Sequence, residues 1–478
     1  MNLLFVASEC APFVKTGGLA DVIGAVPKAL AASGTSVRVL LPAYPALGSV
    51  LASGQQVAEF DDLFGGPARV VAAQAEGLEL LLLDAPYLYD RAGSIYLGPD
   101  GQDWADNDIR FAALSYAGAQ IGLGALGDWT PDVINAHDWQ AGLVPAYLQQ
   151  HDGPRPAVVT TVHNIAFQGV FDATRLSALK LNADQFTSQG VEYYGKVSFL
   201  KAALALSEKI TTVSPSYAAE LMTPEFGMGL DGLLRERQAD LVGIVNGIDL
   251  DVWNPEKDPS IAGTYSARSL KGKAKNRAEL KARFGLNDNF GPVFCVVSRM
   301  TTQKGLDLLL ECLTLLIAEG GQLALLGSGD PDLERAFVSA SARHVGNVGV
   351  IIGYDEELSH LMQAGSDAIL IPSRFEPCGL TQLYGLRYGT LPVVARTGGL
   401  ADTVIDANEA ALLTDCATGV QFAPINATML GHAISRACAL YSNPKLWSAM
   451  MRRAMRHPVG WDLSAKAYLG VYQAALES

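Results

Sequence analysis

The sequence has little positive charge, few cysteines and no long apolar run. Its 35 Lys and Arg residues are outnumbered by 49 Asp and Glu, which gives a formal net charge of −14 over 478 residues. Because no block of basic residues interrupts this acidic balance, neither nucleic acid nor an anionic membrane is an expected partner. An anionic substrate would have to be bound by a few local cations against the overall field.

The six cysteines are scattered and form no CxxC pair, which indicates cytosolic thiols, not a disulfide framework or a zinc site. No apolar segment approaches the roughly 18–20 residues that cross a bilayer. The N-terminal run MNLLFVASECAPFVK lacks a basic start and is interrupted by Glu9, so we interpret it as a first β-strand and not a signal peptide. These features predict a soluble, cytoplasmic protein.

Short apolar runs alternate with helix-length segments almost throughout the chain. NLLFVAS and DVINAHD in the first half, and PVFCVVS and AILIPS in the second, are examples of the apolar runs. Runs of this kind with little alternation are typical of central strands covered on both faces. The alternation predicts an α/β protein with parallel, doubly wound sheets, and the length favours two or three domains.

A polar, turn-rich stretch interrupts this alternation once, near Asn246 to Lys275. We therefore expect an N-terminal Rossmann-like domain over residues 1–245, a linker over 246–275 and a C-terminal Rossmann-like domain over 276–456. Residues 457–478 form an amphipathic terminal helix, which we expect to pack back on the N-terminal domain. The hexapeptide TGGLAD occurs at Thr16–Asp21 and again at Thr397–Asp402, which favours two domains of similar architecture.

The stretch IPSRFEPCG, Ile371 to Gly379, reads as a strand end and a polar loop, and the helix-like LTQLYGLRYG follows it. Ligands of open α/β sheets bind at such carboxyl ends of strands. A glycine at the helix start lets a ligand approach the backbone, and the free N–H groups there favour phosphate. An ordinary turn with solvated charges stays open as an alternative.

Two further loops have the residues of a phosphate site. Lys15, Gly17 and Gly18 follow the first strand, with a helix start behind them and neither a GxGxxG nor a Walker pattern. Arg299 and Lys304 follow the first strand of the second half, and two cations at a strand end favour a diphosphate. For both loops the alternative is a turn with exposed cations.

Histidine and aspartate stand at two other strand ends. His137 and Asp138 end DVINA, and His163 ends VVTTV, so Asp138 and His163 are candidate site residues while His137 reads as structural. The DxD strings at Asp106, Asp249 and Asp330 end no predicted strand. The sequence therefore predicts no metal site.

Seven motifs occur in this order: KTGGLADV, HDWQ, TVHNIAFQG, VNGID, SRMTTQKGLDL, PSRFEPCGLTQLYG and RTGGLADTV. Together they resemble the bacterial glycogen synthase and plant starch synthase family of retaining glucosyltransferases. The resemblance implies the GT-B fold, an α/β architecture of two Rossmann-like, doubly wound domains facing across a cleft. It also implies transfer of glucose from ADP-glucose to the non-reducing end of an α-1,4-glucan such as glycogen, with no cofactor. Because the chain begins at its first strand, the bacterial enzyme is preferred to a plastid one.

The resemblance also implies which residues form the site. A catalytic group would act on the phosphates and the transferred sugar: Glu376, Lys304, Arg299, His163 and Asp138. A substrate-binding group would contact donor and acceptor: Lys15, Gly17, Gly18, Asn246, Tyr354, Cys378, Gly379, Leu380, Thr381 and, on the acceptor side, Tyr96. Tyr354 would stack on adenine, and Cys378 would act through its backbone.

Retention of configuration normally indicates a carboxylate nucleophile. Members of this family instead resemble front-face enzymes, in which the departing phosphate accepts the acceptor's proton, so Glu376 is assigned to sugar positioning. Three alternatives remain: a related transferase with another nucleotide sugar or a small acceptor, a glucan phosphorylase, and a non-catalytic glucan-binding module. The sequence marks no pyridoxal-phosphate lysine, and Lys15, Lys304 and Glu376 are all present, which disfavours the last two.

Overall fold

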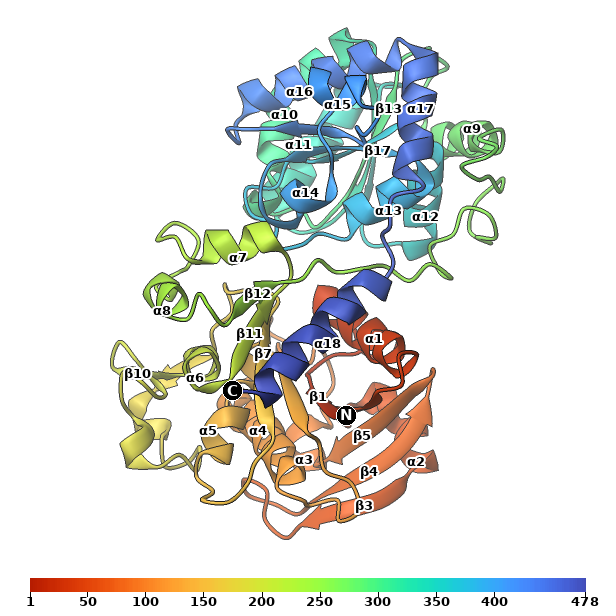
Figure 1. Cartoon of the computed structure of the whole chain (residues 1–478). Coiled ribbons are helices and arrows are strands. Elements are labelled where there is room, and N and C mark those ends of the chain that lie inside the picture. Colours follow the sequence, from red (N-terminus) through yellow and green to blue (C-terminus); the bar gives the residue numbers. More distant parts are fainter. The chain divides into compact units, whose positions relative to one another are not determined.

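The computed structural model describes residues 1–478, which form two compact units (Figure 1): Met1–Asn246 with Trp461–Ser478, and Gly247–Gly460. Both units are α/β, which confirms the fold class that the alternating apolar runs predicted. Each unit has its own sheet and its own core. They are described one after the other.

The first unit contains a nine-stranded sheet in the order β12-β11-β7-β6-β1-β2-β5-β4-β3 and a small sheet in the order β8-β10-β9. Its strands are β1 Asn2–Val6, β2 Ser36–Pro42, β3 Gln55–Phe60, β4 Ala68–Ala75, β5 Leu78–Asp84, β6 Val133–His137, β7 Ala157–Val162, β8 Val170–Asp172, β9 Glu192–Tyr193, β10 Lys196–Ser198, β11 Lys209–Thr212 and β12 Leu241–Gly243. Its helices are α1 Gly18–Ala31, α2 Gly48–Ser53, α3 Pro86–Tyr89, α4 Asn107–Gly122, α5 Val144–Leu148, α6 Phe199–Leu206, α7 Pro215–Leu221, α8 Asp231–Glu236 and α18 Asp462–Leu476.

One edge of this sheet departs from the parallel arrangement that the sequence predicted. Strands β4 and β5 pair antiparallel, as do β3 and β4. Only Glu76 and Gly77 separate β4 from β5, and both have positive φ, +51° and +74°. Such a two-residue turn joins antiparallel strands, whereas a parallel pair needs a crossover of about a dozen residues.

The terminal helix α18 belongs to the first unit. Trp461, Tyr468 and Tyr472 are buried in the same core cluster as Leu3 and Phe5 of the central strand β1. The Tyr472 hydroxyl also donates a 2.6 Å hydrogen bond to the amide oxygen of Asn135 in β6. In Figure 1, α18 lies beside α1, and the two helices are in contact.

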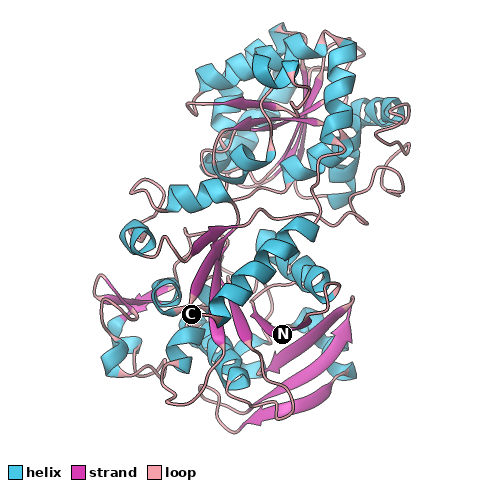
Figure 2. Ribbon diagram, in the orientation of Figure 1, coloured by secondary structure: helices cyan, strands magenta, loops and turns pink.

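The second unit contains a parallel six-stranded sheet in the order β15-β14-β13-β16-β17-β18, with helices on both faces (Figure 2). Its strands are β13 Val293–Val297, β14 Gln322–Gly327, β15 Val348–Ile352, β16 Ala368–Ile371, β17 Leu391–Ala395 and β18 Val420–Phe422. Its helices are α9 Lys273–Phe284, α10 Leu306–Ala318, α11 Pro331–Arg343, α12 Glu356–Gly365, α13 Thr381–Tyr388, α14 Gly398–Thr403, α15 Glu409–Leu413, α16 Ala427–Tyr441 and α17 Pro444–Ala454.

Burial on both faces explains why these strands are continuous apolar runs. Along β13, Phe294 and Val296 pack in one core cluster while Val293 and Cys295 pack in another. Successive side chains of a strand point to opposite faces of the sheet, so a strand covered by helices on both sides has no polar face.

Much of the segment that we expected to be a linker packs within the second unit. The Trp253 ring is stacked between His360 and Tyr384, with centroid distances of 3.8 and 3.6 Å. The buried Asp258 carboxylate contacts the His360 imidazole at 2.7 Å and accepts a hydrogen bond from the Tyr388 hydroxyl. Stacking and hydrogen bonds thus fix this segment against α12 and α13.

Candidate active site

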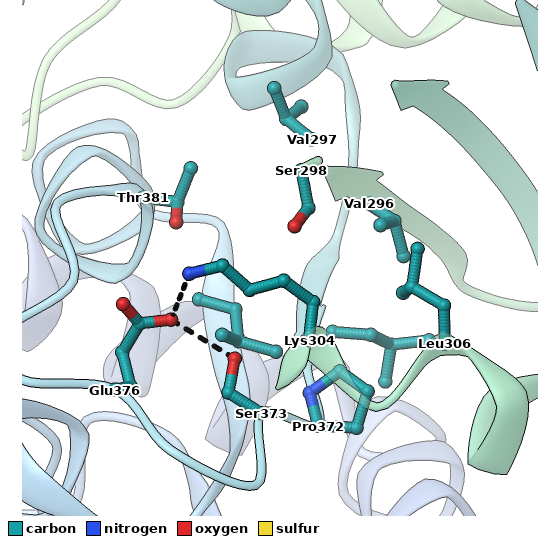
Figure 3. A pocket seen from close by; sticks show the side chains of 11 residues that line it. Val296, Val297, Ser298, Lys304, Leu306, Pro372, Ser373, Glu376 and Thr381 are labelled. Atoms are coloured by element: carbon teal, nitrogen blue, oxygen red, sulfur yellow. Dashed lines mark hydrogen bonds and ion pairs between the residues drawn. The ribbon is translucent and has the colours of Figure 1, made fainter. Parts of the chain in front are cut away.

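Two charged side chains that lie far apart in the sequence meet at the carboxyl ends of β13 and β16. Lys304 follows β13 and its Nζ donates to Glu376 Oε2 at 2.6 Å, and the Ser373 hydroxyl donates to the same oxygen at 3.0 Å (Figure 3). Glu376 is buried and Lys304 is mostly so. With Ser298 and Thr381 they line a pocket at this edge of the sheet. Because an unpaired buried charge is costly, the pair holds both groups in one place.

The loop after Glu376 is shaped by its own backbone and by Gln382. Gly379 has a φ of +74°, which favours glycine. The Gln382 amide donates to the carbonyls of Cys378 and Gly379, both at 2.9 Å, and to the Thr403 hydroxyl at 3.2 Å. No side chain caps the N-terminus of α13 at Leu380. Its first N–H groups are therefore suited to an anion.

The second TGGLAD hexapeptide supports this loop from behind. The Gly399 N–H donates to the carbonyls of Glu376 and Pro377 at 3.2 and 3.0 Å. A Cβ added at Gly398, whose φ is +42°, would lie 2.0 Å from the Glu376 carbonyl oxygen, and one at Gly399 would lie 2.3 Å from that of Cys378. Glycine is therefore required at both positions by packing against the loop.

The remaining predicted residues of the second unit lie on loops. Arg299 directly precedes Met300 after β13, and its side chain is exposed with no ion-pair partner. Tyr354 follows β15, its ring is 73% exposed, and its hydroxyl donates to a Glu356 carboxylate oxygen at 2.7 Å. An exposed aromatic ring is suited to stacking on a planar group, and an unpaired guanidinium is suited to an anion.

In the first unit, the Lys15–Gly18 loop precedes α1. The Lys15 ammonium lies 2.8 Å from a carboxylate oxygen of Asp21. A Cβ added at Gly17 or Gly18 would meet nothing within 4 Å, and neither glycine has a positive φ. Neither conformation nor internal packing thus requires glycine here, which favours close approach of a ligand as the reason.

Asp138 and His163 are adjacent, as their positions at two neighbouring strand ends predicted. The Asp138 carboxylate accepts a hydrogen bond from the backbone N–H of His163 at 2.7 Å. Asp138 itself has a φ of +54°, a strained conformation for a residue other than glycine. Burial raises the pKa of the Asp138 carboxyl from 3.8 to about 7, although the N–H groups of His163 and Asn164 lower it.

His137, which the sequence left as structural, contacts His163. His137 Nδ1 lies 3.0 Å from His163 Nε2. Burial lowers the pKa of both imidazoles, that of His163 to about 3, so both are neutral at pH 7. His137 Nε2 is buried without a partner. If His137 carries its proton on Nδ1, it donates to His163 Nε2 and leaves only an unpaired acceptor at its buried Nε2. The other tautomer would leave an unpaired N–H at Nε2, which costs more, so we assign the proton to Nδ1.

The last two predicted residues, Asn246 and Tyr96, differ in whether their polar atoms have a hydrogen-bond partner. The amide oxygen of Asn246 is buried without a hydrogen-bond partner. The Tyr96 hydroxyl, in contrast, lies 2.7 Å from the Ser8 hydroxyl and donates to the Glu9 carboxylate at 2.6 Å. Tyr96 therefore has its polar atom engaged within the protein, and only its ring remains for an acceptor.

Sequence reasoning missed several residues that hold these loops. Glu9 was noted only because it interrupts an apolar run, and Gln382 and Thr403 carry no charge. The signal that could have found Gln382 is its place at the second position of α13, directly behind the loop that carries Glu376. Gly399 was seen as part of a repeat, but not as a support of the Glu376 loop.

The structure brings together no group of three or more His, Cys, Asp or Glu that could hold a metal ion. No helix combines the length and the apolar character that a bilayer crossing requires.

Two family models match most of the chain. The model described as "Starch synthase catalytic domain" matches residues 2–236, and that described as "Glycosyl transferases group 1" matches residues 276–453. The chain belongs to the glycogen and starch synthase family. It is an enzyme, a glycosyltransferase with the GT-B fold.

Named relatives and solved structures agree with this family. The chain is 63% identical over 478 residues to glycogen synthase of Roseobacter denitrificans, covering 100% of both chains, and 55% identical to glycogen synthase 1 of Rhizobium meliloti, covering 100% of this chain and 99% of that one. The catalytic domain of starch synthase IV from Arabidopsis thaliana, bound to ADP and acarbose, superposes with a TM-score of 0.88 at 30% identity, over 100% of this chain and 99% of that one.

A more distant member of the same fold is sucrose-phosphate synthase from Thermosynechococcus elongatus. It superposes with a TM-score of 0.59 at 18% identity, covering 99% of this chain and 98% of that one. At this identity the likeness concerns the fold alone.

Proposed function

We propose that the chain transfers glucose from ADP-glucose to the non-reducing end of an α-1,4-glucan such as glycogen, with retention of configuration and release of ADP. The observation that carries the proposal is the contact of Lys304 with Glu376 beside the uncapped N-terminus of α13. Lys304 is a cation and the start of α13 has free N–H groups, which together suit a phosphate. The Glu376 carboxylate suits sugar hydroxyls. The glycogen synthase names of the relatives and the ADP bound to the similar starch synthase support the choice of donor and acceptor.

The chemistry requires negative charge to be stabilised on the departing diphosphate while positive charge develops at the anomeric carbon. In our proposal Lys304, Arg299 and the N–H groups of Leu380 and Thr381 bind the phosphates. Charges and dipoles that are already in place need no reorganisation during the reaction, which is why such groups accelerate it. Lys15, Gly17 and Gly18 of the first unit serve the same diphosphate.

The sugar would be held by both hydrogen-bond acceptors and hydrogen-bond donors. Glu376 accepts hydrogen bonds from the glucose hydroxyls, with the backbone of Cys378 and Gly379 beside it. His163 is neutral because burial lowers its pKa to about 3, so it is suited to donate a hydrogen bond to the transferred sugar without adding charge. Asp138 and Asn246 complete the sugar contacts, Tyr354 stacks on adenine, and the Tyr96 ring serves the acceptor side.

We infer a front-face reaction in which the departing phosphate accepts the proton of the acceptor hydroxyl. Glu376 already accepts two hydrogen bonds through one oxygen, from Lys304 and Ser373, and this supports a role in positioning. Trapping a glucosyl-enzyme on Glu376 or Asp138 would contradict this mechanism. The experiment is mass spectrometry of the intact protein after incubation with ADP-glucose without acceptor, where we expect no added hexose.

A donor panel tests the substrates. The protein is incubated with glycogen and ADP-, UDP- or GDP-glucose, and nucleotide release is measured. We expect ADP release at a rate at least about tenfold above that of the other nucleotides, with a dependence on glycogen. Release from UDP-glucose only, or release from ADP-glucose that glycogen does not stimulate, would refute the proposal and favour a related transferase with another donor or a small acceptor. The Lys304→Ala variant is the control for a contaminating activity, since we expect its rate to fall by about 100-fold or more.

A further inference from the structure

Glu9, in the loop after β1, is a buried carboxylate with no cation beside it. Its side chain accepts hydrogen bonds from the Thr16 N–H at 2.6 Å, the Gly17 N–H at 3.2 Å, the Thr16 hydroxyl at 2.7 Å and the Tyr96 hydroxyl at 2.6 Å. The residue is 4% exposed. Burial of a carboxylate is costly unless hydrogen bonds satisfy its oxygens, and here four donors do so.

Both oxygens of the Glu9 carboxylate act as acceptors. Oε1 accepts from the two hydroxyls of Thr16 and Tyr96, and Oε2 accepts from the two N–H groups of Thr16 and Gly17. An apolar side chain of similar length, such as that of methionine, would offer none of these acceptors and would leave the two N–H groups without a partner. The two N–H bonds to Oε2 are therefore the contacts through which Glu9 fixes the backbone of the loop.

The Lys15–Gly18 loop has few other internal contacts that would fix it. A Cβ at Gly17 or Gly18 would meet nothing within 4 Å, and Lys15 pairs only with the nearby Asp21. Gly17, the residue before α1, has no side chain with which to cap the helix. Glu9 instead accepts from the N–H groups of Thr16 and Gly17, the two residues before the helix, from a different segment of the chain. Tyr96 in turn fixes Glu9 through its hydroxyl and contacts the Ser8 hydroxyl at 2.7 Å.

The same contacts restrict what the loop can offer to a ligand. The N–H groups of Thr16 and Gly17 donate to Glu9, so they are not open to phosphate. The N–H groups of the first turn of α1, beginning with that of Gly18, and the Lys15 ammonium are not engaged by Glu9. A loop whose backbone is already fixed binds a ligand at a lower conformational cost.

We propose that Glu9 is a positioning residue whose carboxylate holds the Lys15–Gly18 loop in the conformation that binds the diphosphate of the donor. The inference rests on the proposed function for the identity of that ligand. Glu9 acts through the loop and does not touch the donor itself. Its loss is therefore expected to weaken donor binding and to leave glucan binding intact.

The experiment compares the Glu9→Met variant, which keeps the length of the side chain but has no acceptor oxygen, with the wild type by two independent readouts. The first is hydrogen exchange of the peptide that contains Thr16 and Gly17, measured without ligand. The second is the dissociation constant of ADP, together with KM for ADP-glucose and for glycogen. The Tyr96→Phe variant removes the hydroxyl contacts with Glu9 and Ser8 and serves if Glu9→Met does not fold. The matched control is Tyr89→Phe, which also removes one buried hydroxyl, here a donor to the Arg110 carbonyl, but leaves Glu9 untouched.

We expect Glu9→Met to lose the exchange protection of Thr16 and Gly17 and to raise the ADP dissociation constant and the ADP-glucose KM by about 10- to 100-fold. The KM for glycogen should change by less than about threefold, and Tyr89→Phe should leave all of these values as in the wild type. Unchanged protection, or equal increases of both KM values, would refute the inference. If the wild type neither binds ADP nor uses ADP-glucose, the proposed function fails, while the exchange readout still decides whether Glu9 holds the loop.

Discussion

In the first TGGLAD hexapeptide, Thr16–Asp21, both glycines face open space, whereas in the second, Thr397–Asp402, both lie against the backbone of the loop that carries Glu376. The first copy is held by the Glu9 carboxylate, which accepts from the N–H of its first glycine. The second copy donates the N–H of its second glycine to the carbonyls of Glu376 and Pro377. The same six residues thus precede and begin a helix in both units but have different neighbours.

The comparison separates duplicated architecture from duplicated role. An internal repeat reflects a shared local structure, the turn into a helix, and this is what both copies have. Whether a copy can bind a ligand depends on which atoms lie next to its two glycines. At Gly17 and Gly18 nothing of the protein does, which leaves room for a ligand, while at Gly398 and Gly399 the protein's own loop occupies that space.

The largest effect is expected from Gly399→Ala. The added Cβ would lie 2.3 to 2.7 Å from backbone atoms of Cys378, so the loop or α14 must shift. We expect a loss of unfolding free energy of about 4 kcal/mol and a near-complete loss of activity, since Glu376 moves with the loop. Denaturant unfolding and the glycogen-dependent release of ADP check this. A stable and active Gly399→Ala protein would show that the second copy does not support the loop.

The raised pKa of the Asp138 carboxyl makes the stability of the first unit depend on pH. Because burial raises its pKa to about 7, the folded protein keeps a proton that the unfolded chain loses between pH 4 and 7. Unfolding free energy therefore falls as pH rises through this window, by roughly 4 kcal/mol for this group. His137 and His163, with lowered pKa values, act in the opposite direction, so a difference measurement is needed.

That measurement compares the wild type with Asp138→Asn at several pH values between 4 and 7.5. We expect the variant to gain stability relative to the wild type as pH rises. The reason is that the introduced amide does not titrate, while its oxygen can still accept a hydrogen bond from the backbone N–H of His163. Parallel curves for the two proteins would contradict a raised pKa of Asp138.

The basic residues that precede the two hexapeptides should differ in their effect on activity. Lys15→Ala is expected to lower kcat/KM for ADP-glucose by about 10- to 100-fold, because a cation near phosphate contributes about 1.5–3 kcal/mol. Arg396→Ala is its matched control, since Arg396 is exposed and stands at the equivalent position of the second copy. Its kcat/KM should stay within about twofold of the wild type. Equal losses in both variants would indicate that the two copies serve the donor alike.

The smallest effect on stability is expected from Gly18→Ala. Its Cβ meets no atom within 4 Å, and alanine is the better helix former, so unfolding free energy should change by less than about 1 kcal/mol. Donor KM should nevertheless rise if a ligand approaches this backbone. A Gly18→Ala protein with unchanged KM for ADP-glucose would remove the argument for close approach at the first copy.

Much of the fold followed from local patterns. Apolar runs without alternation, such as those of β13 and β16, identified strands covered on both faces. The antiparallel pairing of β3, β4 and β5 could have been read from the two-residue turn at Glu76 and Gly77, but apolar content alone does not give strand direction. The weakly apolar β3 carries no such run and was missed.

The site was predictable where residues stand at strand ends and not where they act through space. Asp138 and His163 follow two strands that prove to be neighbours in the sheet, and they are in contact. The pairing of Lys304 with Glu376 depends on β13 and β16 being adjacent in the sheet although two strands come between them in the sequence. The role of Glu9 depends on four donors that only the folded chain brings together.

The most direct test of the proposed reaction is the stereochemistry of its product. The protein is incubated with ADP-glucose and a maltooligosaccharide, and the new anomeric proton is observed by NMR while ADP is quantified. We predict an oligosaccharide extended at its non-reducing end by an α-1,4-linked glucose, with one ADP released for each glucose added. A β-linked product, or ADP release without extension of the glucan, would contradict the proposed function.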